Sequence, residues 1–568
     1  MKSGKKFLAL LLALSMTLMA GVASAEVYTA AAQGIGGDVN GSVTYENGKI
    51  TAGEIGAHNA TPGISDMAIE KIPTAIVEEQ SLAVDAVAGA TITSNAILTA
   101  AQTALTEAGV DVAAMLVKEE TVLAQGETEE TDVVIVGAGL AGLMAAYELK
   151  DNHPEVNYIL LEKLDMVTGS LPTTGGAIVA TTSKLHSADN AECTTQDIVD
   201  LFTYTSGTAI NDKLVHNVYA ESNVVLDRLV GWNCNFITPQ PSSTYSDKVI
   251  SYWHDGRGAG LVSVMNPYME ANPVNLRTAT KAESLIVEDG KVVGVHVSDS
   301  EKTYDIRAKY VILATGGFGS NEEYMKQYLP LFADGFFSTN AGATGDGIAM
   351  TAQFGTKVVG DGSMGTIVAP DGSALIAVNF IVNNEGERFI GETEPKYVLQ
   401  RAVSQQPGKE AFLIADSTYA DMETIEKKIA QGFVKKYDTI EELAKDNGID
   451  SAKLAATVET YNAAADKGEA IPAKEYALNA GAANKVAVAP YYVEKATLRT
   501  FGTIPGIEVN ETCQVLDGEG KPVEGLYGVG ELIAGNAFTR QYPGAGIGIS
   551  WAANTGRYVA AELAKLLK

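Results

Sequence analysis

The stretch TDVVIVGAGLAGLMAAYELK, Thr131–Lys150, decides the fold of most of the chain. It opens with a short run of β-branched apolar residues, which predicts a buried strand of a parallel sheet. Gly137, Gly139 and Gly142 follow in a G-x-G-x-x-G pattern, and a helix rich in alanine and leucine comes after them. In this pattern the first glycine permits a tight turn, the second lets a pyrophosphate approach the backbone, and the third lets helix and strand pack closely.

A carboxylate at the end of the next predicted strand supports this interpretation. That strand is YILLEK, and Glu162 lies near its end. A carboxylate at this spacing can accept a hydrogen bond from a ribose hydroxyl. The glycine pattern alone is a weak signal, but the strand, the turn, the helix and the carboxylate together predict a dinucleotide-binding unit.

Three further segments narrow the choice of dinucleotide. They are VILATGGFGSN (Val311–Asn321), ATGDGIAM (Ala343–Met350) and GLYGVGELIAGN (Gly525–Asn536). Together with the first motif they resemble the fumarate reductase and succinate dehydrogenase flavoprotein family, which includes urocanate reductases, L-aspartate oxidases and ketosteroid dehydrogenases. The resemblance covers about residues 131–568.

The resemblance implies an α/β fold and non-covalently bound FAD. We expect a Rossmann-like FAD-binding domain of the glutathione reductase type over residues 131–355 and 496–568, with a mobile α+β capping domain inserted at 356–495. The resemblance implies a set of FAD-binding residues: Gly137, Gly139, Gly142, Glu162, Thr174, Gly175, Gly176, Gly316, Asp346 and Glu531.

The N-terminal residues read as a targeting segment and a second, smaller domain. Residues 1–25 have a basic start, a short apolar run and a small-residue cleavage site, which is typical of a secretory signal peptide. The mature protein is therefore expected to be soluble and extracytoplasmic. Residues 119–130 are acidic and poor in apolar residues, and predict a linker between residues 26–118 and the α/β region.

The stretch VDAVAGATITSNAI, with HNATPG before it, resembles the FMN-binding domain of respiratory flavoproteins. The resemblance implies a small α+β domain over residues 26–118. It also implies that a flavin transferase attaches FMN by a phosphoester to the last threonine of the motif, which is Thr93. Gly89 would let the transferase approach, and Asp85 could hold a metal that bridges the incoming phosphate. The alternative is an ordinary turn into a helix, with Thr91 or Thr93 as its N-cap.

Composition restricts the partners and the other cofactors. The chain carries 41 basic against 70 acidic residues, a net charge of -29, and this field argues against nucleic acid as a partner. The three cysteines, Cys193, Cys234 and Cys513, are far apart, and no C-x-x-C-H motif for a c-type haem occurs. Buried free thiols are expected, with a Cys193–Cys234 disulfide as the alternative, and no metal site is predicted.

The resemblance also implies catalytic residues. Relatives deliver hydride from the flavin to an activated C=C bond, and in fumarate reductases an arginine supplies the proton. In this chain Lys396 stands at that position, with Tyr397 beside it. Lys396 is either the acid or a solvated surface lysine. Arg540 matches a carboxylate-binding arginine, and Lys396 and Arg540 are expected to flank the flavin ring from opposite sides.

Two more residues complete the predicted site. Arg499 sits where relatives place a substrate-binding histidine, although it could instead pair with an acidic neighbour. Tyr542 lies in a region where ketosteroid dehydrogenases use a tyrosine to contact a carbonyl. Fewer cationic residues are found here than the family uses to bind a dicarboxylate. This argues against fumarate itself and favours a substrate with one carboxylate or a carbonyl.

These observations predict a two-flavin reductase. A membrane-associated donor would reduce FMN, electrons would pass to FAD, and FAD would reduce an unsaturated acid or enone as a respiratory acceptor. One alternative is fumarate reductase proper. Another is an electron-transfer flavoprotein without a small-molecule substrate.

Overall fold

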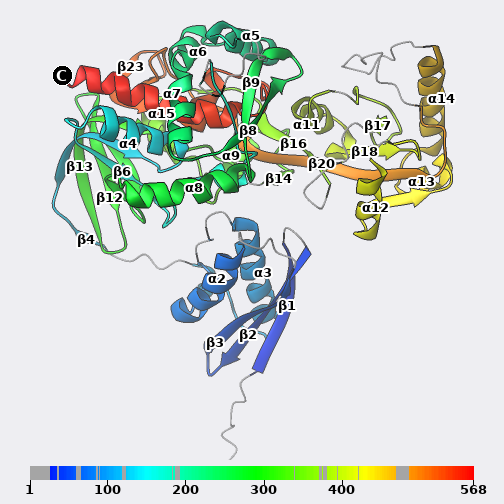
Figure 1. Cartoon of the computed structure of the whole chain (residues 1–568). Helices are drawn as coiled ribbons and strands as arrows, with labels where there is room; N and C mark the ends of the chain where they lie inside the picture. The colour runs from blue at the N-terminus through cyan, green and yellow to red at the C-terminus, as the bar shows by residue number, and fades with distance from the viewer. Residues whose placement is uncertain are drawn as a thin grey trace, which may run out of the picture. The chain divides into compact units, whose positions relative to one another are not determined.

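The computed structural model describes residues 26–34, 37–58, 65–84, 87, 90–117, 123–181, 183, 185, 192–337, 339–369, 374, 380–392, 394–419, 421–467 and 485–568. The chain divides into two compact units, Met1–Thr121 and Val122–Lys568 (Figure 1). The predicted signal peptide lies outside the described residues. Among the helices that are described, none combines the length and apolar character needed to cross a membrane.

The first unit is a small α+β domain, as predicted. Its three strands form an antiparallel sheet in the order β1-β2-β3, and two helices pack on that sheet. The elements are β1 (Glu26–Gly34), β2 (Gly37–Glu46), β3 (Lys49–His58), α2 (Asp66–Glu79), α3 (Thr91–Glu107) and the 3-10 turn η1 (Ala114–Leu116). Val39, Ile72 and Leu105 are buried between sheet and helices. The unit therefore has a hydrophobic core of its own.

The second unit is built on a nine-stranded sheet. Its main path runs β10-β6-β5-β13-β12-β11, and β23 and β4 also pair with β13. The strands are β4 (Ala124–Gln125), β5 (Glu129–Val136), β6 (Tyr158–Leu161), β10 (Leu276–Arg277), β11 (Lys281–Glu288), β12 (Lys291–Ser298), β13 (Lys302–Leu313), β22 (Gln514–Leu516) and β23 (Pro522–Gly528). β10, β6, β5, β13 and β23 are parallel, whereas β11 and β12 form an antiparallel extension of β13.

Helices cover this sheet and bury its apolar strands. Val133–Val136 of β5 are buried, and α4 (Leu140–Asn152) follows them directly. α4 packs against the C-terminal helix α15 (Ile547–Leu566), which lies beside it in Figure 1. The predicted α/β fold with a glycine turn between β5 and α4 is confirmed. All three cysteines are buried free thiols, so the alternative Cys193–Cys234 disulfide is excluded.

The linker predicted over residues 119–130 is wrong in its second half. Ala124 and Gln125 pair with the start of β13, and Glu129 already belongs to β5. The Glu129 carboxylate forms an ion pair with Arg277 at 2.6 Å. The acidic composition suggested a solvated segment. The long strand β13, however, has backbone N–H and C=O groups available for pairing, and the segment forms strand hydrogen bonds with them.

The remaining elements of the α/β region are a small sheet, helices and 3-10 turns. β7 (Ala177–Val179), β8 (Phe236–Ser243) and β9 (Ser246–His254) form a small sheet. The helices are α5 (Thr195–Ser206), α6 (Asp212–Tyr219), α7 (Ser222–Gly231), α8 (Arg257–Ala271), α9 (Glu322–Tyr328) and α10 (Asp346–Thr351), with the 3-10 turns η2 (Leu171–Thr173), η3 (Ala352–Phe354) and η5 (Gly530–Asn536).

The inserted domain is a mixed α+β structure, as predicted. Its six-stranded sheet is centred on the long strand β20, which pairs with four other strands. The strands are β14 (Phe336–Phe337), β16 (Ser363–Val368), β17 (Phe380–Val382), β18 (Glu410–Ala415), β19 (Val434–Tyr437) and β20 (Tyr491–Thr503). The helices are α11 (Lys396–Ser404), α12 (Met422–Ala430), α13 (Ile440–Asp446) and α14 (Ser451–Lys467), with the 3-10 turn η4 (Pro407–Lys409).

The ends of this sheet differ from the expected boundaries 355/356 and 495/496. β14 precedes residue 356, and β20 continues to Thr503, as the orange strand of Figure 1 shows. One part of β20 pairs with β18 and the next part with β16, so the strand cannot be divided at residue 495. The short pair β15 (Val358–Val359) and β21 (Gly506–Ile507) lies next to these ends. β20 therefore runs from the inserted domain into the α/β region.

Candidate active site

One cavity of about 400 Å³ collects residues from both parts of the second unit. From the α/β region it is lined by the glycine-rich segments; we call Gly137, Gly139, Glu162, Gly316 and Glu531 the nucleotide group. From the inserted domain and the loop before α15 it is lined by a second set. Five residues of this set, which we call the tyrosine group, are Met364, Tyr397, Arg499, Phe501 and Tyr542.

The three glycines of the first motif have different local geometries. Gly137 has φ +106°, and a Cβ there would lie 2.4 Å from the carbonyl oxygen of Ala314. A Cβ on Gly142 would lie 1.9 Å from the carbonyl oxygen of Gly137, so this glycine lets α4 pack on the turn and does not line the cavity. A Cβ on Gly139 would meet no atom within 4 Å. The backbone at Gly139 is therefore open to the cavity, as close approach of a phosphate requires.

Glu162 is held by the backbone around it. One carboxylate oxygen accepts from the Ala138 N–H and the other from the Leu164 N–H, both at 2.9 Å. Burial raises the pKa of this carboxyl. Each oxygen keeps a second lone pair, so the side chain can still accept a hydrogen bond from a ribose hydroxyl.

Lys163, the residue after Glu162, forms an ion pair with Asp346 at the start of α10. The Lys163 ammonium donates to the Asp346 carboxylate at 2.8 Å and to the Thr344 hydroxyl at 2.6 Å. Both Lys163 and Asp346 line the cavity. Sequence reasoning included Asp346 but missed Lys163, although its place directly after Glu162 was a usable signal.

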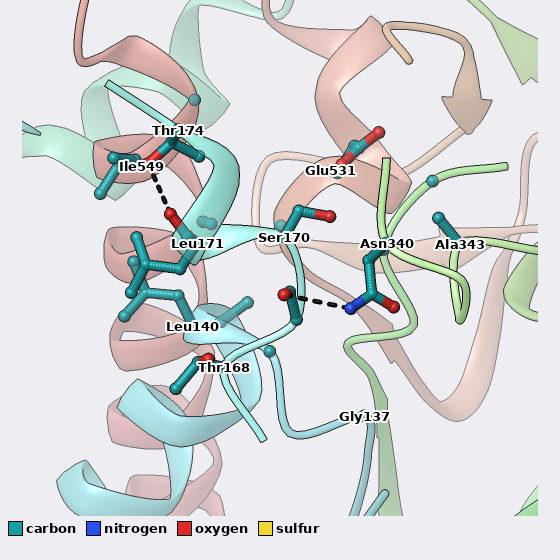
Figure 2. Close-up of a pocket in the computed structure, with 18 of the residues that line it drawn as sticks. Gly137, Leu140, Thr168, Ser170, Leu171, Thr174, Asn340, Ala343, Glu531 and Ile549 are labelled. Carbon is teal, nitrogen blue, oxygen red and sulfur yellow. Dashed lines mark hydrogen bonds between the residues drawn. The ribbon is translucent and has the colours of Figure 1, made fainter. Parts of the chain in front are cut away.

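The loop containing Thr174, Gly175 and Gly176 forms one wall of the cavity. The Thr174 hydroxyl donates to the Leu171 carbonyl at 2.8 Å, as Figure 2 shows. Gly175 lines the cavity, whereas Gly176 has φ +71° and packs against the backbone of Arg257. Across the cavity, the Asn340 amide donates to the Gly169 carbonyl at 3.1 Å (Figure 2).

Gly316 and Glu531 belong to the other two glycine-rich segments. Gly316 has φ +73° and an open Cβ position, like Gly139. Glu531 is half-buried, and one of its oxygens accepts from the backbone N–H and the hydroxyl of Thr503, at 2.6 and 2.9 Å. Burial raises the pKa of this carboxyl. Gly139, Gly316, Glu162 and the helix start after Gly139 together fit an extended dinucleotide such as FAD.

Tyr397 and Tyr542 are in contact. Their ring centroids are 4.8 Å apart at an interplanar angle of 77°, and Phe501 lies 6.2 Å from Tyr542. The Tyr542 oxygen accepts from the Gly548 N–H at 2.8 Å. Burial raises the pKa of Tyr397, and it raises the pKa of Tyr542 to about 12. Both phenols therefore stay protonated at neutral pH.

Arg499 supplies a cation beside these rings. It lies on β20 two residues before Phe501, and both side chains line the cavity, although a bulge in the pairing of β20 with β16 falls at Phe501. Burial lowers the pKa of Arg499, although a guanidinium remains charged at neutral pH. Phe501 was missed by sequence reasoning, and its closeness to Arg499 in the sequence was the available signal.

The other two predicted catalytic residues are Lys396 and Arg540. Lys396 is the first residue of α11, but its side chain lies outside the described residues, so its role stays a prediction. Arg540 is exposed and does not line the cavity, and the expectation that it faces the flavin is corrected. Its carbonyl is directed inward instead, where it accepts from Arg401 at 3.2 Å. Arg401 was not singled out from the sequence.

In the first unit, Thr93 lies in the first turn of α3. It is 3% exposed, and its hydroxyl is 3.0 Å from that of Ser65. The N-cap of α3 is Ala90, so neither Thr91 nor Thr93 is the cap that the alternative required. Asp85 and Gly89 lie outside the described residues.

Comparisons with known proteins agree with this arrangement. The family described as FAD binding domain matches residues 132–549, and the family described as FMN-binding domain matches residues 34–106. A urocanate reductase of Eggerthella lenta is 29% identical over 91% of this chain and 89% of that protein. An NADH:acrylate oxidoreductase of Vibrio harveyi is 28% identical over 89% of this chain, which spans only 58% of the Vibrio protein.

A solved structure is similar as well. The open conformation of a flavocytochrome c3 fumarate reductase matches with a TM-score of 0.61 at 27% identity, covering 78% of this chain and 79% of that one. The match between the FAD-binding family and residues 132–549 covers most of the chain. The protein therefore belongs to the FAD-binding family of fumarate reductase-like flavoproteins, and it is an FAD-dependent oxidoreductase that also carries an FMN-binding domain.

Proposed function

We propose that this protein is an extracytoplasmic two-flavin reductase that transfers electrons from a membrane-associated donor to the activated C=C bond of an unsaturated acid or enone. The observation that carries the proposal is a single cavity that combines the nucleotide group with Arg499 and two neutral phenols. The names of the relatives support the reaction class, since they specify urocanate, acrylate and fumarate.

The composition of the tyrosine group favours a substrate with one polar end. Arg499 is its one cation among the described residues, because the other cations that line the cavity, Lys163, Arg257 and Lys281, belong to the α/β region; Met364, Phe501 and the two tyrosine rings are apolar or aromatic. A small dicarboxylate would need a second cation, because an unpaired carboxylate in such surroundings is costly to bury. An aryl acrylate, urocanate or an enone instead places a planar apolar body against these rings.

The residues can stabilise the charge that forms during reduction. FAD bound in this cavity would supply a hydride to the β-carbon of the substrate. Negative charge then develops on the substrate carbonyl or carboxylate, where Arg499 can stabilise it. The Tyr542 oxygen already accepts from Gly548, so its hydrogen is available to the same substrate oxygen. Lys396, or Tyr397 beside it, would protonate the α-carbon.

For the first unit we propose that a flavin transferase attaches FMN covalently to Thr93. The FMN-binding match over residues 34–106 and the GATIT motif support this assignment. The Thr93 hydroxyl is buried beside Ser65, so attachment requires local opening of the unit.

Mass spectrometry tests the attachment. Thr93→Ala, coexpressed with a flavin transferase, should lose one FMN from the intact mass, whereas the neighbouring control Thr91→Ala should keep it. An adduct that persists on Thr93→Ala would contradict the assignment.

An anaerobic assay tests the reductase function. The holoprotein is reduced, and trans-cinnamate, urocanate, acrylate, fumarate or a cyclic enone is added while flavin absorbance is recorded. At least one of these acceptors should reoxidise the flavin, and the saturated control 3-phenylpropionate should not. If no acceptor reoxidises it but a redox protein does, the chain is an electron-transfer flavoprotein.

A further inference from the structure

Helix α11 contacts the segments that build the tyrosine group. Tyr397, near its start, meets the ring of Tyr542 at 4.8 Å. One turn later, the Gln400 amide donates to the Arg499 carbonyl at 2.9 Å. The next residue, Arg401, donates to the Arg540 carbonyl at 3.2 Å. A single helix of the inserted domain therefore fixes β20 on one side and the loop of residues 540–542 on the other.

The guanidinium of Arg401, which contacts that loop, is buried without full compensation of its charge and N–H groups. Its side chain is 9% exposed, and its carboxylate partner, Asp361, is 65% exposed at 3.3 Å. The buried Nε has no hydrogen-bond partner among the described residues. A buried guanidinium with an exposed partner and an unsatisfied N–H is costly, and an apolar side chain would fill the position more favourably. Stability alone gives no reason for an arginine here.

The backbone around the contact is tightly packed. A Cβ on Gly362 would lie 2.1 Å from the Arg540 carbonyl oxygen, and the Asp361 N–H donates to the Thr539 carbonyl at 2.8 Å. Arg401 is thus the side chain that connects α11 to a rigid backbone junction. Tyr542 is two residues beyond this junction, so a shift of the Arg540 carbonyl would move the phenol.

We propose that Arg401 is a positioning residue, which holds the Arg540 carbonyl against α11 and so fixes Tyr542 against Tyr397 in one geometry. The inference rests on the proposed function, in which these phenols meet the substrate. Arg401 does not line the cavity and takes no part in proton transfer. Its loss should therefore act only through the tyrosines.

A double-mutant cycle tests this inference. Arg401→Gln, Tyr542→Phe and the double variant are compared as FAD-loaded full-length protein, with trans-cinnamate as the first probe and otherwise the fastest acceptor of the anaerobic panel. We expect Arg401→Gln to lower kcat/KM by about 10- to 100-fold, because a misplaced group near the reaction costs about this much. The double variant should be no slower than Tyr542→Phe alone, within about twofold.

Two further variants separate positioning from general damage. Arg401→Lys keeps one donor for the Arg540 carbonyl and should recover part of the rate. The matched control is Arg228→Gln, which also removes a buried, ion-paired arginine but in α7, where it bonds to Glu148 at 2.8 Å. This control should lower Tm without changing kcat/KM.

Each outcome decides the inference. Additive effects of Arg401→Gln and Tyr542→Phe would overturn the positioning role while leaving the proposed function intact. A rate loss in Arg228→Gln equal to that in Arg401→Gln would overturn it as well. An unchanged rate in Tyr542→Phe would contradict the proposed role of the tyrosine, and the inference would fall with it.

Discussion

The nucleotide group and the tyrosine group line one cavity but are built in different ways. The first consists mainly of backbone, since Gly137, Gly139 and Gly316 contribute no side chain, and Glu162 is held by the backbone N–H groups of Ala138 in the glycine turn and of Leu164. The second consists of side chains that come from β16, β20, α11 and the loop before α15. Substitutions in or beside the first group should therefore weaken FAD binding, whereas substitutions in the second group should change the rate and the substrate specificity.

The largest effect is expected at the close contact of the glycine motif. Gly142→Ala places a Cβ 1.9 Å from the Gly137 carbonyl oxygen, and relief requires the backbone of the turn to move. We expect a loss of about 1–3 kcal/mol in stability together with most of the bound FAD. Thermal denaturation and FAD content measure both. Gly231→Ala, where a Cβ meets nothing within 4 Å, is the control and should be neutral.

The next largest effect is expected from the proposed proton donor. Lys396→Ala should leave substrate affinity nearly unchanged and slow turnover by about 10²–10⁴, the usual contribution of a general acid. Lys396→Arg introduces the residue that the resemblance to fumarate reductases implies at this position and should retain part of the rate. Steady-state kinetics checks this. A fast Lys396→Ala together with a slow Tyr397→Phe would transfer the role to the tyrosine.

A smaller effect on rate is expected at the cation of the tyrosine group. Arg499→Gln removes the charge that stabilises the substrate oxygen, and we expect kcat/KM to fall by about 10²–10³, with FAD content unchanged. Arg499→Lys should keep part of this activity as a point charge. Loss of FAD from Arg499→Gln would mean that the two groups are not separable in the way described above.

The smallest effect concerns pH. The pKa of Tyr542 is raised by burial from 10.0 to about 12, so the phenol is neutral in the folded protein while the unfolded chain already ionises above pH 10. The folded state should therefore lose stability as pH rises from about 10 to 12, and Tyr542→Phe should lose less. Tm measured between pH 9 and 11 checks the difference. Identical slopes for the two proteins would contradict it.

The comparison also explains which features could be predicted from the sequence. The nucleotide group was accessible because its glycines act through local backbone geometry within a few residues of a strand. Arg540 and Tyr542 are two residues apart; Tyr542 lines the cavity and Arg540 does not, and the Arg540 carbonyl is held by Arg401 from a helix some 140 positions earlier. Such long-range contacts leave no local pattern.

The boundary of the insertion was missed for a similar reason. β20 is one continuous strand whose first part pairs with β18 and whose last part pairs with β16. Only the last part lines the cavity. Arg499 was identified from the sequence and Phe501 was not, and only the structure shows that both line one cavity with Tyr542.

The central claim is that the cavity places an unsaturated substrate with one polar end beside FAD. Stopped-flow reoxidation of the anaerobically reduced holoprotein tests it most directly, with trans-cinnamate and fumarate at equal concentration. The account predicts that cinnamate reoxidises the flavin at least about tenfold faster, because Arg499 pairs with one carboxylate and Lys396 is assigned to the α-carbon, so the second carboxylate of fumarate has no cationic partner in the tyrosine group. Equal rates, or faster reoxidation by fumarate, would contradict it.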